Sequence, residues 1–566
     1  ELLPGLNAVD GVKAVFVLGM LLGGVGVYGF VRDNWGRGGG LLAASLFLYA
    51  PYIQYIDPHA RGVLAESFSF GVLAMALCFL DRVRRGHGRL SRFACVGWIS
   101  AVILAHNLMA LVSFGLLSAW AVWMVLWEKP GWETAVRLFT ALGLGLGLAA
   151  FFWLPVILER HAVNLNTLIG DGGNYDFHSH FLSWAELLRF SRRLDWGAAE
   201  PAFSFNLGVV QWLFAGVTLL FLAWGRLKQQ TYQLWFFALS LVVLIFMMLP
   251  VSGFLWGSIP FLPFFQFPWR LLGPTAVLLA VLAGAGFEAV VAEKKWKTWA
   301  TATAVLLPIL FGLPLTQPAP WNDFGPANLW QMSTIEQKGY WLGTTSTADY
   351  VPVTVEMTPG RQGGVVAPLE VGQPLDRVNW TAVPDGATVE TENLTPLHVR
   401  YVVNTPIDFR LRLFLIDYPG WQVQVDGRPA EAELGTPEGF IVVPLTAGQH
   451  EVDVNFGTTP ARQAAWGVTV VSLLAALFLF WRWSKYETAV EPAAIHPSEW
   501  PVWTAVLGMT AVFVFILNPS GMLHLASSGN EALVAETAVN ADFGGQINLI
   551  GYTASDTVLQ PGGTLT

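Results

Sequence analysis

Apolar residues occur along this chain in separate runs of about 20 residues, divided by short polar stretches. A helical run of that length crosses a hydrocarbon core of roughly 30 Å. A membrane barrel fits less well, because its strands would alternate apolar and polar residues over shorter segments. The pattern predicts about a dozen spanning helices, at residues 11–31, 39–55, 63–80, 93–105, 108–127, 136–158, 208–224, 232–249, 271–292, 298–313, 464–483 and 500–517.

The longest polar insertion, residues 316–462, alternates apolar and polar residues over short stretches. Turn-forming pairs such as Asp426-Gly427 and Ala447-Gly448 separate these stretches. Alternation bounded by turn formers is typical of antiparallel strands with one buried face. It predicts a sheet or sandwich with strands that include residues 350–356, 410–416, 421–425 and 450–456.

Together the two patterns predict a multi-span α-helical membrane protein with an inserted extracytoplasmic β-sandwich-like domain. Its parts are a transmembrane domain at 1–315, the β-rich domain at 316–462, two C-terminal transmembrane helices at 463–518 and an extracytoplasmic tail at 519–566. The end of the tail has the pattern of a β-segment that is too short to fold alone. Because Glu1 is not a start methionine and the tail stops within this segment, we expect the natural protein to continue at both ends.

Positive charge predicts the orientation, since loops rich in Lys and Arg face the cytoplasm. Residues 81–92 (DRVRRGHGRLSR) form the most basic loop. Alternation of the spans places it on one side with the other basic stretches, at 32–37, 128–137, 226–228, 293–297 and 481–485. The sequence thus predicts a multi-pass protein of the cell membrane, whose N-terminus, β-rich domain and tail lie outside the cytoplasm.

Composition supports a membrane protein and excludes some other classes. Charged residues make up 13% of the 566 residues, and the mean hydropathy is +0.50; soluble chains usually have about 25% charged residues. No Lys- or Arg-rich tract suggests a nucleic-acid groove, so no nucleic-acid partner is expected. Cys78 and Cys95 lie in predicted spans and fit neither a disulfide framework nor a zinc site.

Charged groups at membrane depth are costly, so each one is a candidate site residue. Asp57, His59, Arg61 and Glu66 fall within ten residues at the predicted outer face, where Pro58 is expected to break the helix. Carboxylates and a histidine there could bind a divalent ion, position a phosphate-bearing donor or abstract a proton. The alternative is an interfacial loop whose charges sit in water.

Two further places lie on the same predicted side. His106 and Asn107 separate two apolar spans, as part of a site or as a tight turn capped by Asn107. Arg270 enters a span on the outer side, against the usual charge distribution. It could clamp a lipid phosphate through both arms of its guanidinium, or serve as an interfacial anchor.

The external stretch 159–207 is the fourth candidate region. It contains Glu159, His161, His178 and His180, but no complete metal-ligand pattern. Residues 184–190 (WAELLRF) predict a short amphipathic helix on the membrane surface. We expect the stretch to cover a cavity.

Several of these residues also carry a family resemblance. Residues 55–66 with ARGVLAE, the His106-Asn107 pair, residues 267–270 (FPWR) and residues 343–352 (GTTSTADYVP) resemble bacterial membrane proteins described as 6-pyruvoyl-tetrahydropterin-synthase-related. Residues 418–426 (YPGWQVQVD) followed by 447–451 (AGQHE) resemble the end of the external domain in YfhO-like membrane proteins. Both families are similar to GT-C glycosyltransferases.

The resemblance implies a GT-C-like fold and transfer of a sugar from a polyprenyl-phosphate donor to a glycan or protein acceptor. GT-C enzymes usually carry a catalytic acid in the first external loop, of which only residues 1–13, with Glu1 and Asp10, are present here. Asp10, Asp57 and Glu66 are the candidate catalytic residues. The candidate substrate-binding residues are His59, Arg61, His106, Asn107, Arg270, Glu159 and His161. The resemblance implies no specific cofactor. The residue types would allow a divalent cation to bind.

Three functions stay open at this point. The first is the lipid-linked glycosyltransferase, with membrane lipids, the donor and an acceptor as partners. The second is a non-enzymatic membrane scaffold subunit of a larger assembly, and the third is a lipid or polysaccharide transporter. Transporters usually contain inverted repeats, and no clear repeat is evident in this sequence. Convergence of Asp57, Arg61, Glu66 and Arg270 on one cavity would favour the enzyme.

Overall fold

The computed structural model describes residues 8–165, 175–194, 202–227, 231–316, 350–359, 371–373, 375–483, 500–512 and 516, and four short strands between 527 and 552. The chain divides into two compact units. The first comprises Glu1–Gly147, Phe177–Trp321 and Leu474–Thr566, and the second comprises Leu148–Asp176 and Asn322–Leu473.

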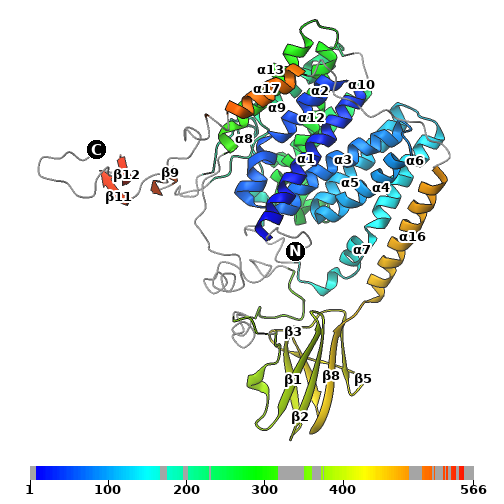
Figure 1. The fold of residues 1–566 in the computed structure, drawn as a ribbon, viewed down its shortest axis with the longest axis vertical. Helices are drawn as coiled ribbons and strands as arrows, with labels where there is room; N and C mark the ends of the chain where they lie inside the picture. The colour runs from blue at the N-terminus through cyan, green and yellow to red at the C-terminus, as the bar shows by residue number, and fades with distance from the viewer. Residues whose placement is uncertain are drawn as a thin grey trace, which may run out of the picture. The chain divides into compact units, whose positions relative to one another are not determined.

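The first unit is built from helices (Figure 1). The long ones are α1 (Ala8–Asn34), α2 (Arg37–Leu48), η1 (Tyr52–Arg61), α3 (Leu64–Arg84), α4 (Arg89–Ala105), α5 (Asn107–Trp127), α6 (Trp132–Leu148), α9 (Val209–Ala223), α10 (Thr231–Met248), α12 (Leu272–Val291), α13 (Lys297–Gly312) and α17 (Trp500–Val512). Short elements connect them: η4 (Phe177–His180), α8 (Trp184–Leu188), η5 (Pro250–Ser252), α11 (Gly253–Ser258), η6 (Leu262–Phe265), η7 (Pro268–Leu271) and η8 (Leu313–Thr316).

The expected multi-span membrane fold is confirmed by helix length and composition. Eight helices among the described residues are long and apolar enough to cross a membrane, or nine if α6 and α7 (Ala150–Leu158) form one span. Helices also occur at the other predicted spans, but α4, α9 and α17 have only 17, 15 and 13 residues. The span predicted over 136–158 is divided into two helices, because α6 ends at Leu148 and α7 begins at Ala150.

Helix α12 forms the centre of the first unit. Of its apolar window, 83% is buried within the protein, and α1, α2, α3, α9 and α10 pack around it. The neighbouring helices α1 and α3 approach so closely that a Cβ on Gly71 would lie 2.0 Å from the carbonyl oxygen of Gly19. Small residues at such contacts let helix backbones pack directly against each other, as is typical of membrane bundles.

Charged side chains lie at both ends of α3. Glu66 is in its first turn, whereas Asp81 near its last turn accepts hydrogen bonds from Asn34 (2.8 Å), Arg84 (2.7 Å) and Arg85 (2.9 Å). Glu66 and Asp81 are fifteen residues apart, which corresponds to a rise of about 23 Å along α3. Most of the apolar part of this span therefore lies between the two charged layers.

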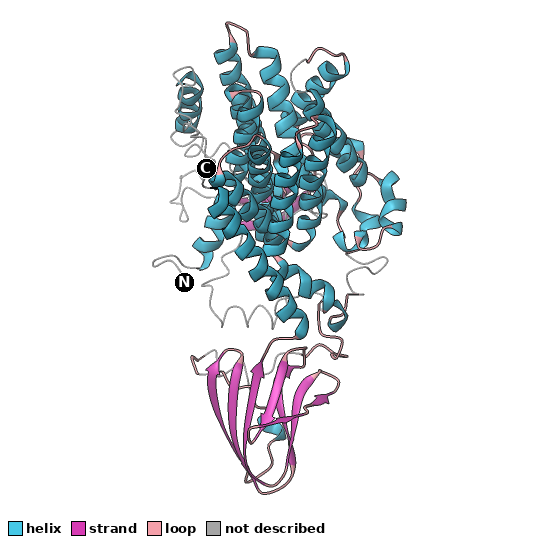
Figure 2. Cartoon of the chain, turned by 90° about the vertical axis from the view of Figure 1, so that its right-hand side faces the viewer, coloured by secondary structure: helices cyan, strands magenta, loops and turns pink. Residues whose placement is uncertain are grey.

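The described part of the second unit contains α7, η2 (Arg160–Ala162), a β-sandwich and the first part of α16 (Pro460–Trp483), with the strands coloured magenta in Figure 2. One sheet has the order β1-β2-β8-β4-β5 and the other the order β3-β7-β6, all pairs antiparallel. The strands are β1 (Thr388–Thr395), β2 (His398–Thr405), β3 (Phe409–Ile416), β4 (Trp421–Val425), β5 (Arg428–Ala430), β6 (Glu433–Gly435), β7 (Phe440–Leu445) and β8 (Gly448–Phe456).

Inward-facing residues of both sheets form one hydrophobic core that includes Val399, Tyr401, Leu411, Val443 and Val452. The predicted sandwich is thus confirmed, with β3, β4 and β8 at three of the predicted strands. The predicted strand at 350–356 is wrong: among the described residues, this segment joins no sheet and forms an isolated bridge between Pro352 and Val163. The tail contains β11 (Thr537–Phe543) and β12 (Ile547–Tyr552), whereas residues 553–566 lie outside the described residues.

Candidate functional site

The stretch predicted as a loop with a helix break at Pro58 is helical. Residues Tyr52–Arg61 form a π-helix, η1, with Pro58 inside it, so the predicted break is wrong. The helix ends at Gly62, which has the left-handed φ of 67° that glycine adopts at no steric cost. The N–H groups of Gly62 and Val63 both donate to the carbonyl oxygen of Asp57, and α3 starts directly afterwards.

The π-helical turn brings Tyr52 and Arg61 together. They are nine residues apart, which is two and a half turns of an α-helix and would place them on opposite faces. A π-helix closes its hydrogen bonds to the fifth residue, so its turns are wider and both side chains share a face. Arg61 Nη1 donates to the Tyr52 hydroxyl at 2.8 Å. The same guanidinium contacts the carboxylate of Asp57, one turn earlier.

Glu66 is the centre of the resulting cluster. Its carboxylate accepts a hydrogen bond of 2.8 Å from the Tyr52 hydroxyl and lies 3.1 Å from Arg61 Nη1. Arg270 Nε is 3.2 Å from its second oxygen, and His106 Nε2 is 4.0 Å away. Asp57 and Glu66 are 0% exposed, so both carboxylates depend on these partners for the stabilisation that water would otherwise supply.

Arg270 reaches the cluster from η7, which joins α11 and η6 to α12. Its Nη1 donates to the carbonyl oxygen of Phe265 at 3.1 Å, and the preceding Gln266 is held in a left-handed conformation with φ 63°. Its Nε is buried and close to Glu66, but the two groups are not aligned as a hydrogen bond. The Arg270–Glu66 contact is therefore an ion pair that keeps one N–H donor available.

Aromatic rings cover the guanidinium groups. Arg61 lies over the ring of Trp269 at 4.4 Å, and Arg270 lies over Phe267 at 4.8 Å. Trp269 in turn stacks on Phe205 at 4.4 Å and on Phe267 at 4.7 Å. Such cation–π contacts strengthen when water is excluded, so the stack both holds Arg61 and desolvates it. The ring of His180 packs against the edge of the same stack, 4.6 Å from Phe267.

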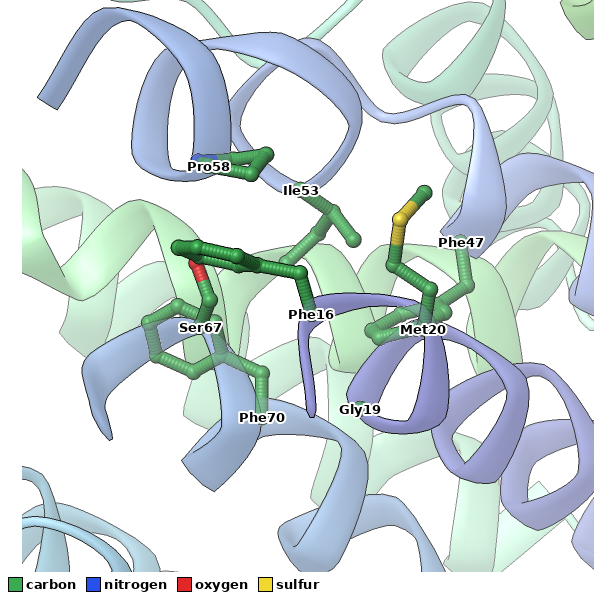
Figure 3. A pocket seen from close by; sticks show the side chains of 8 residues that line it. All are labelled: Phe16, Gly19, Met20, Phe47, Ile53, Pro58, Ser67 and Phe70. Atoms are coloured by element: carbon green, nitrogen blue, oxygen red, sulfur yellow. The ribbon is translucent and has the colours of Figure 1, made fainter. Parts of the chain in front are cut away.

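An apolar pocket adjoins the cluster (Figure 3). Its cavity volume is about 10 Å³, roughly the room that one water molecule needs. It is lined by Phe16, Gly19 and Met20 of α1, Phe47 of α2, Ile53 and Pro58 of η1, and Ser67 and Phe70 of α3. In the view of Figure 3, the ring of Phe16 lies below Pro58 and above Phe70. Ser67 Oγ donates to Asp57 at 2.6 Å, so this hydroxyl connects the pocket to the charged cluster.

The structure thus brings together five of the ten residues named from the sequence: Asp57, Arg61, Glu66, His106 and Arg270. His59 is on the same π-helix, but its side chain is exposed and lies 6.2 Å from the ring of Tyr55. Asp10 is half-buried in the first turn of α1. In the part of the chain that the structure describes, no group of three or more His, Cys, Asp or Glu residues is arranged to hold a metal ion.

The predicted cap at Asn107 is wrong. His106 is the N-cap of α5, and its Nδ1 accepts a hydrogen bond of 3.2 Å from the N–H of Met109. Asn107 is the first helical residue, is exposed, and accepts from Leu108 N–H. Capping fixes the His106 ring with Nε2 toward Glu66, because the cap uses the other ring nitrogen.

Glu159 and His161 belong to the second unit. Glu159 accepts a hydrogen bond from the Thr459 hydroxyl and one of 3.0 Å from Arg462 Nε, and His161 lies in η2. Glu159 therefore joins the end of α7 to the start of α16.

The predicted surface helix at 184–190 is shorter than expected: α8 covers Trp184–Leu188, with Trp184 exposed and Leu187 buried.

Sequence reasoning missed Tyr52, Ser67 and Trp269. All three are common residue types in or near membrane spans, and none carries a charge that demands a partner. Tyr52 could have been found only by treating residues 52–61 as a π-helix.

The chain matches no protein-family model, no curated protein and no solved structure. The resemblance to GT-C-type proteins therefore rests on the quoted residues alone.

Proposed function

We propose that this chain is a membrane-embedded glycosyltransferase that moves a sugar from a polyprenyl-phosphate donor to an extracytoplasmic acceptor. The observation that carries the proposal is the convergence of two buried carboxylates and two arginines from η1, α3 and η7 on one point. Charge buried at the end of a membrane span is costly, and in membrane proteins it usually marks a substrate or ion site.

The residues suit the chemistry of such a transfer. A carboxylate takes the proton of the acceptor hydroxyl as that oxygen bonds to the anomeric carbon. The bond between this carbon and the donor phosphate breaks, and the lipid phosphate leaves with the electron pair. We assign Asp57 as the base, because a single arginine faces it, whereas Glu66 faces two arginines and the Tyr52 hydroxyl.

The leaving phosphate needs a cation in a site that excludes water. Arg270 fits this role, since the N–H of its buried Nε has no hydrogen-bond partner among the described residues. Arg61 is held in place by Asp57, Glu66 and Trp269, and it supplies a second positive charge beside Arg270. In this proposal the β-sandwich binds the acceptor or a partner protein.

One observation favours a non-enzymatic scaffold instead. Each carboxylate of the cluster already contacts an arginine, so the charges balance without any ligand. A purely structural ion network would have this composition, because an unpaired buried charge is strongly destabilising. The two functions differ in whether the arginines bind an added phosphate.

The test is binding of a short-chain polyprenyl phosphate to the purified chain in nanodiscs. We expect Arg270→Gln to weaken binding about tenfold or more, because a hydrogen bond to a charged group contributes about 1.5–3 kcal/mol. We expect Asp57→Asn to bind the probe but not to transfer a sugar from polyprenyl-phosphate donors.

The matched control is Glu288→Gln. Glu288 is 2% exposed and paired with Lys297, so this variant also removes a buried carboxylate. Glu288 lies near the end of α12, whereas Arg270 lies just before the start of this 20-residue helix. Binding per folded molecule should be unchanged in this variant. Failure of the unaltered chain to bind the probe, or equal binding by Arg270→Gln, would reject the transferase and leave the scaffold.

A further inference from the structure

The tip of the β1–β2 hairpin lies at the end of the sandwich from which the chain enters the membrane. Strand β8 ends at Phe456 and the span α16 begins at Pro460, so only Gly457, Thr458 and Thr459 separate sheet and span (Figure 1). Four residue steps cover at most about 14 Å. The register pairs His398 with Asn455, and Phe456 N–H donates to the carbonyl oxygen of Leu397 at 2.9 Å.

The height of this hairpin relative to the start of α16 is fixed by contacts at the junction. Gly457 N–H donates to the carbonyl oxygen of Gly420 at 2.7 Å, and Arg462 donates to that of Pro419 at 2.9 Å. The Arg462 guanidinium also lies over the ring of Phe456 at 5.0 Å. The same arginine binds Glu159, where the apolar helix α7 ends. Two apolar helices therefore end at the level of the hairpin tip.

The chemistry of the tip differs from that of the opposite end. Between Glu392 and His398 it carries no charge, and Leu394 and Leu397 are 39% and 54% exposed. The turns at the opposite end contain Asp408 and Asp426. Apolar side chains beside a membrane span are stabilised by entering the lipid boundary, whereas the charged turns need water.

We propose that the β1–β2 tip, residues 393–397, inserts Leu394 and Leu397 into the headgroup region of the leaflet from which α16 emerges. The partner is the lipid surface itself. This contact holds the sandwich against the membrane in addition to the covalent link through residues 457–459. It is independent of any catalytic function of the helical unit.

The test is the lipid exposure of single labels on the purified chain in nanodiscs. Leu397→Cys is labelled with a polarity-sensitive fluorophore, and emission is recorded with and without lipids that carry a quencher near the headgroup. We expect a blue-shifted emission and a loss of fluorescence on adding the quencher lipid. The unmutated chain, whose Cys78 and Cys95 are buried, measures the background.

Two variants calibrate the result. Val471→Cys lies on α16 with the native side chain 67% exposed, so its label should be quenched by lipid. Ile407→Cys has nearly the same native exposure as Leu397, 55%, but lies one strand length away, about 25 Å, at the other end of the sandwich. Its label should stay in water. A Leu397 label that behaves like the one at Ile407, while Val471 is quenched, would overturn the proposal.

Discussion

At the scale of single residues, the sequence predicts the charged members of the cluster and misses the neutral ones. A charge at membrane depth must find a partner, so Asp57, Arg61, Glu66 and Arg270 could be named from their positions alone. Their pairing could not be predicted, because it depends on η7 bringing Arg270 to Glu66 across more than two hundred residues of sequence. The neutral Tyr52 bridges Arg61 and Glu66 without any such sequence signal.

The bridging role of Tyr52 gives a prediction about stability. Tyr52→Phe removes a hydroxyl that donates to Glu66 and accepts from Arg61, in a position 2% exposed. We expect a loss of about 1.5–3 kcal/mol in the free energy of unfolding, as for a hydrogen bond to a charged group. Reversible unfolding in mixed micelles measures it.

Tyr49→Phe is the matched control for this change. Tyr49 precedes η1, and its hydroxyl has no hydrogen-bond partner among the described residues. Its loss should leave stability nearly unchanged. Equal effects of the two substitutions would show that the Tyr52 hydroxyl does not stabilise the cluster.

At the scale of elements, the apolar runs predict where helices lie, but not how they end or approach each other. The segment 52–61 looks like a loop because it contains polar residues and Pro58, yet the π-helix accommodates both. The break at Ala149 between α6 and α7 has no proline or polar residue to mark it. The strand expected at 350–356 is absent: the segment forms an isolated bridge with Val163 after α7, and the N–H of Glu356 donates to the carbonyl oxygen of Pro437.

The contact between α1 and α3 gives a prediction at this scale. A Cβ on Gly71 would lie 2.0 Å from a backbone oxygen of α1, which cannot move aside as a flexible side chain can. Gly71→Ala should therefore destabilise the protein by about 1–3 kcal/mol, as for an overpacked core. Thermal unfolding of the purified chain measures the change.

Gly97→Ala provides the comparison, since Gly97 is also within a helix, α4, and a Cβ there meets nothing within 4 Å. Alanine favours a helix over glycine by about 1 kcal/mol, so this variant should be as stable as the parent or more stable. If both substitutions had the same effect, the close approach of α1 and α3 would be refuted.

At the scale of the whole molecule, the two periodicities of the sequence predict a multi-span helical protein that carries a β-sandwich, and the helices and sheets confirm this. The orientation follows from charge: the basic loop 81–92 is predicted to face the cytoplasm, with the cluster and the sandwich on the other side. Charged groups at both ends of α3, with apolar residues between them, fit a membrane-spanning helix. The proposed function needs the cluster and the sandwich to share one compartment.

Cysteine accessibility in intact cells shows on which side of the membrane the cluster, the sandwich and the basic loop each lie. His59→Cys lies beside the cluster, Ile407→Cys on the sandwich and His87→Cys in the basic loop, and the native Cys78 and Cys95 are buried. A membrane-impermeant maleimide should label positions 59 and 407 in intact cells, and position 87 only after permeabilisation. Labelling of positions 59 and 407 from opposite sides, or of 87 and 407 from the same side, would contradict the account.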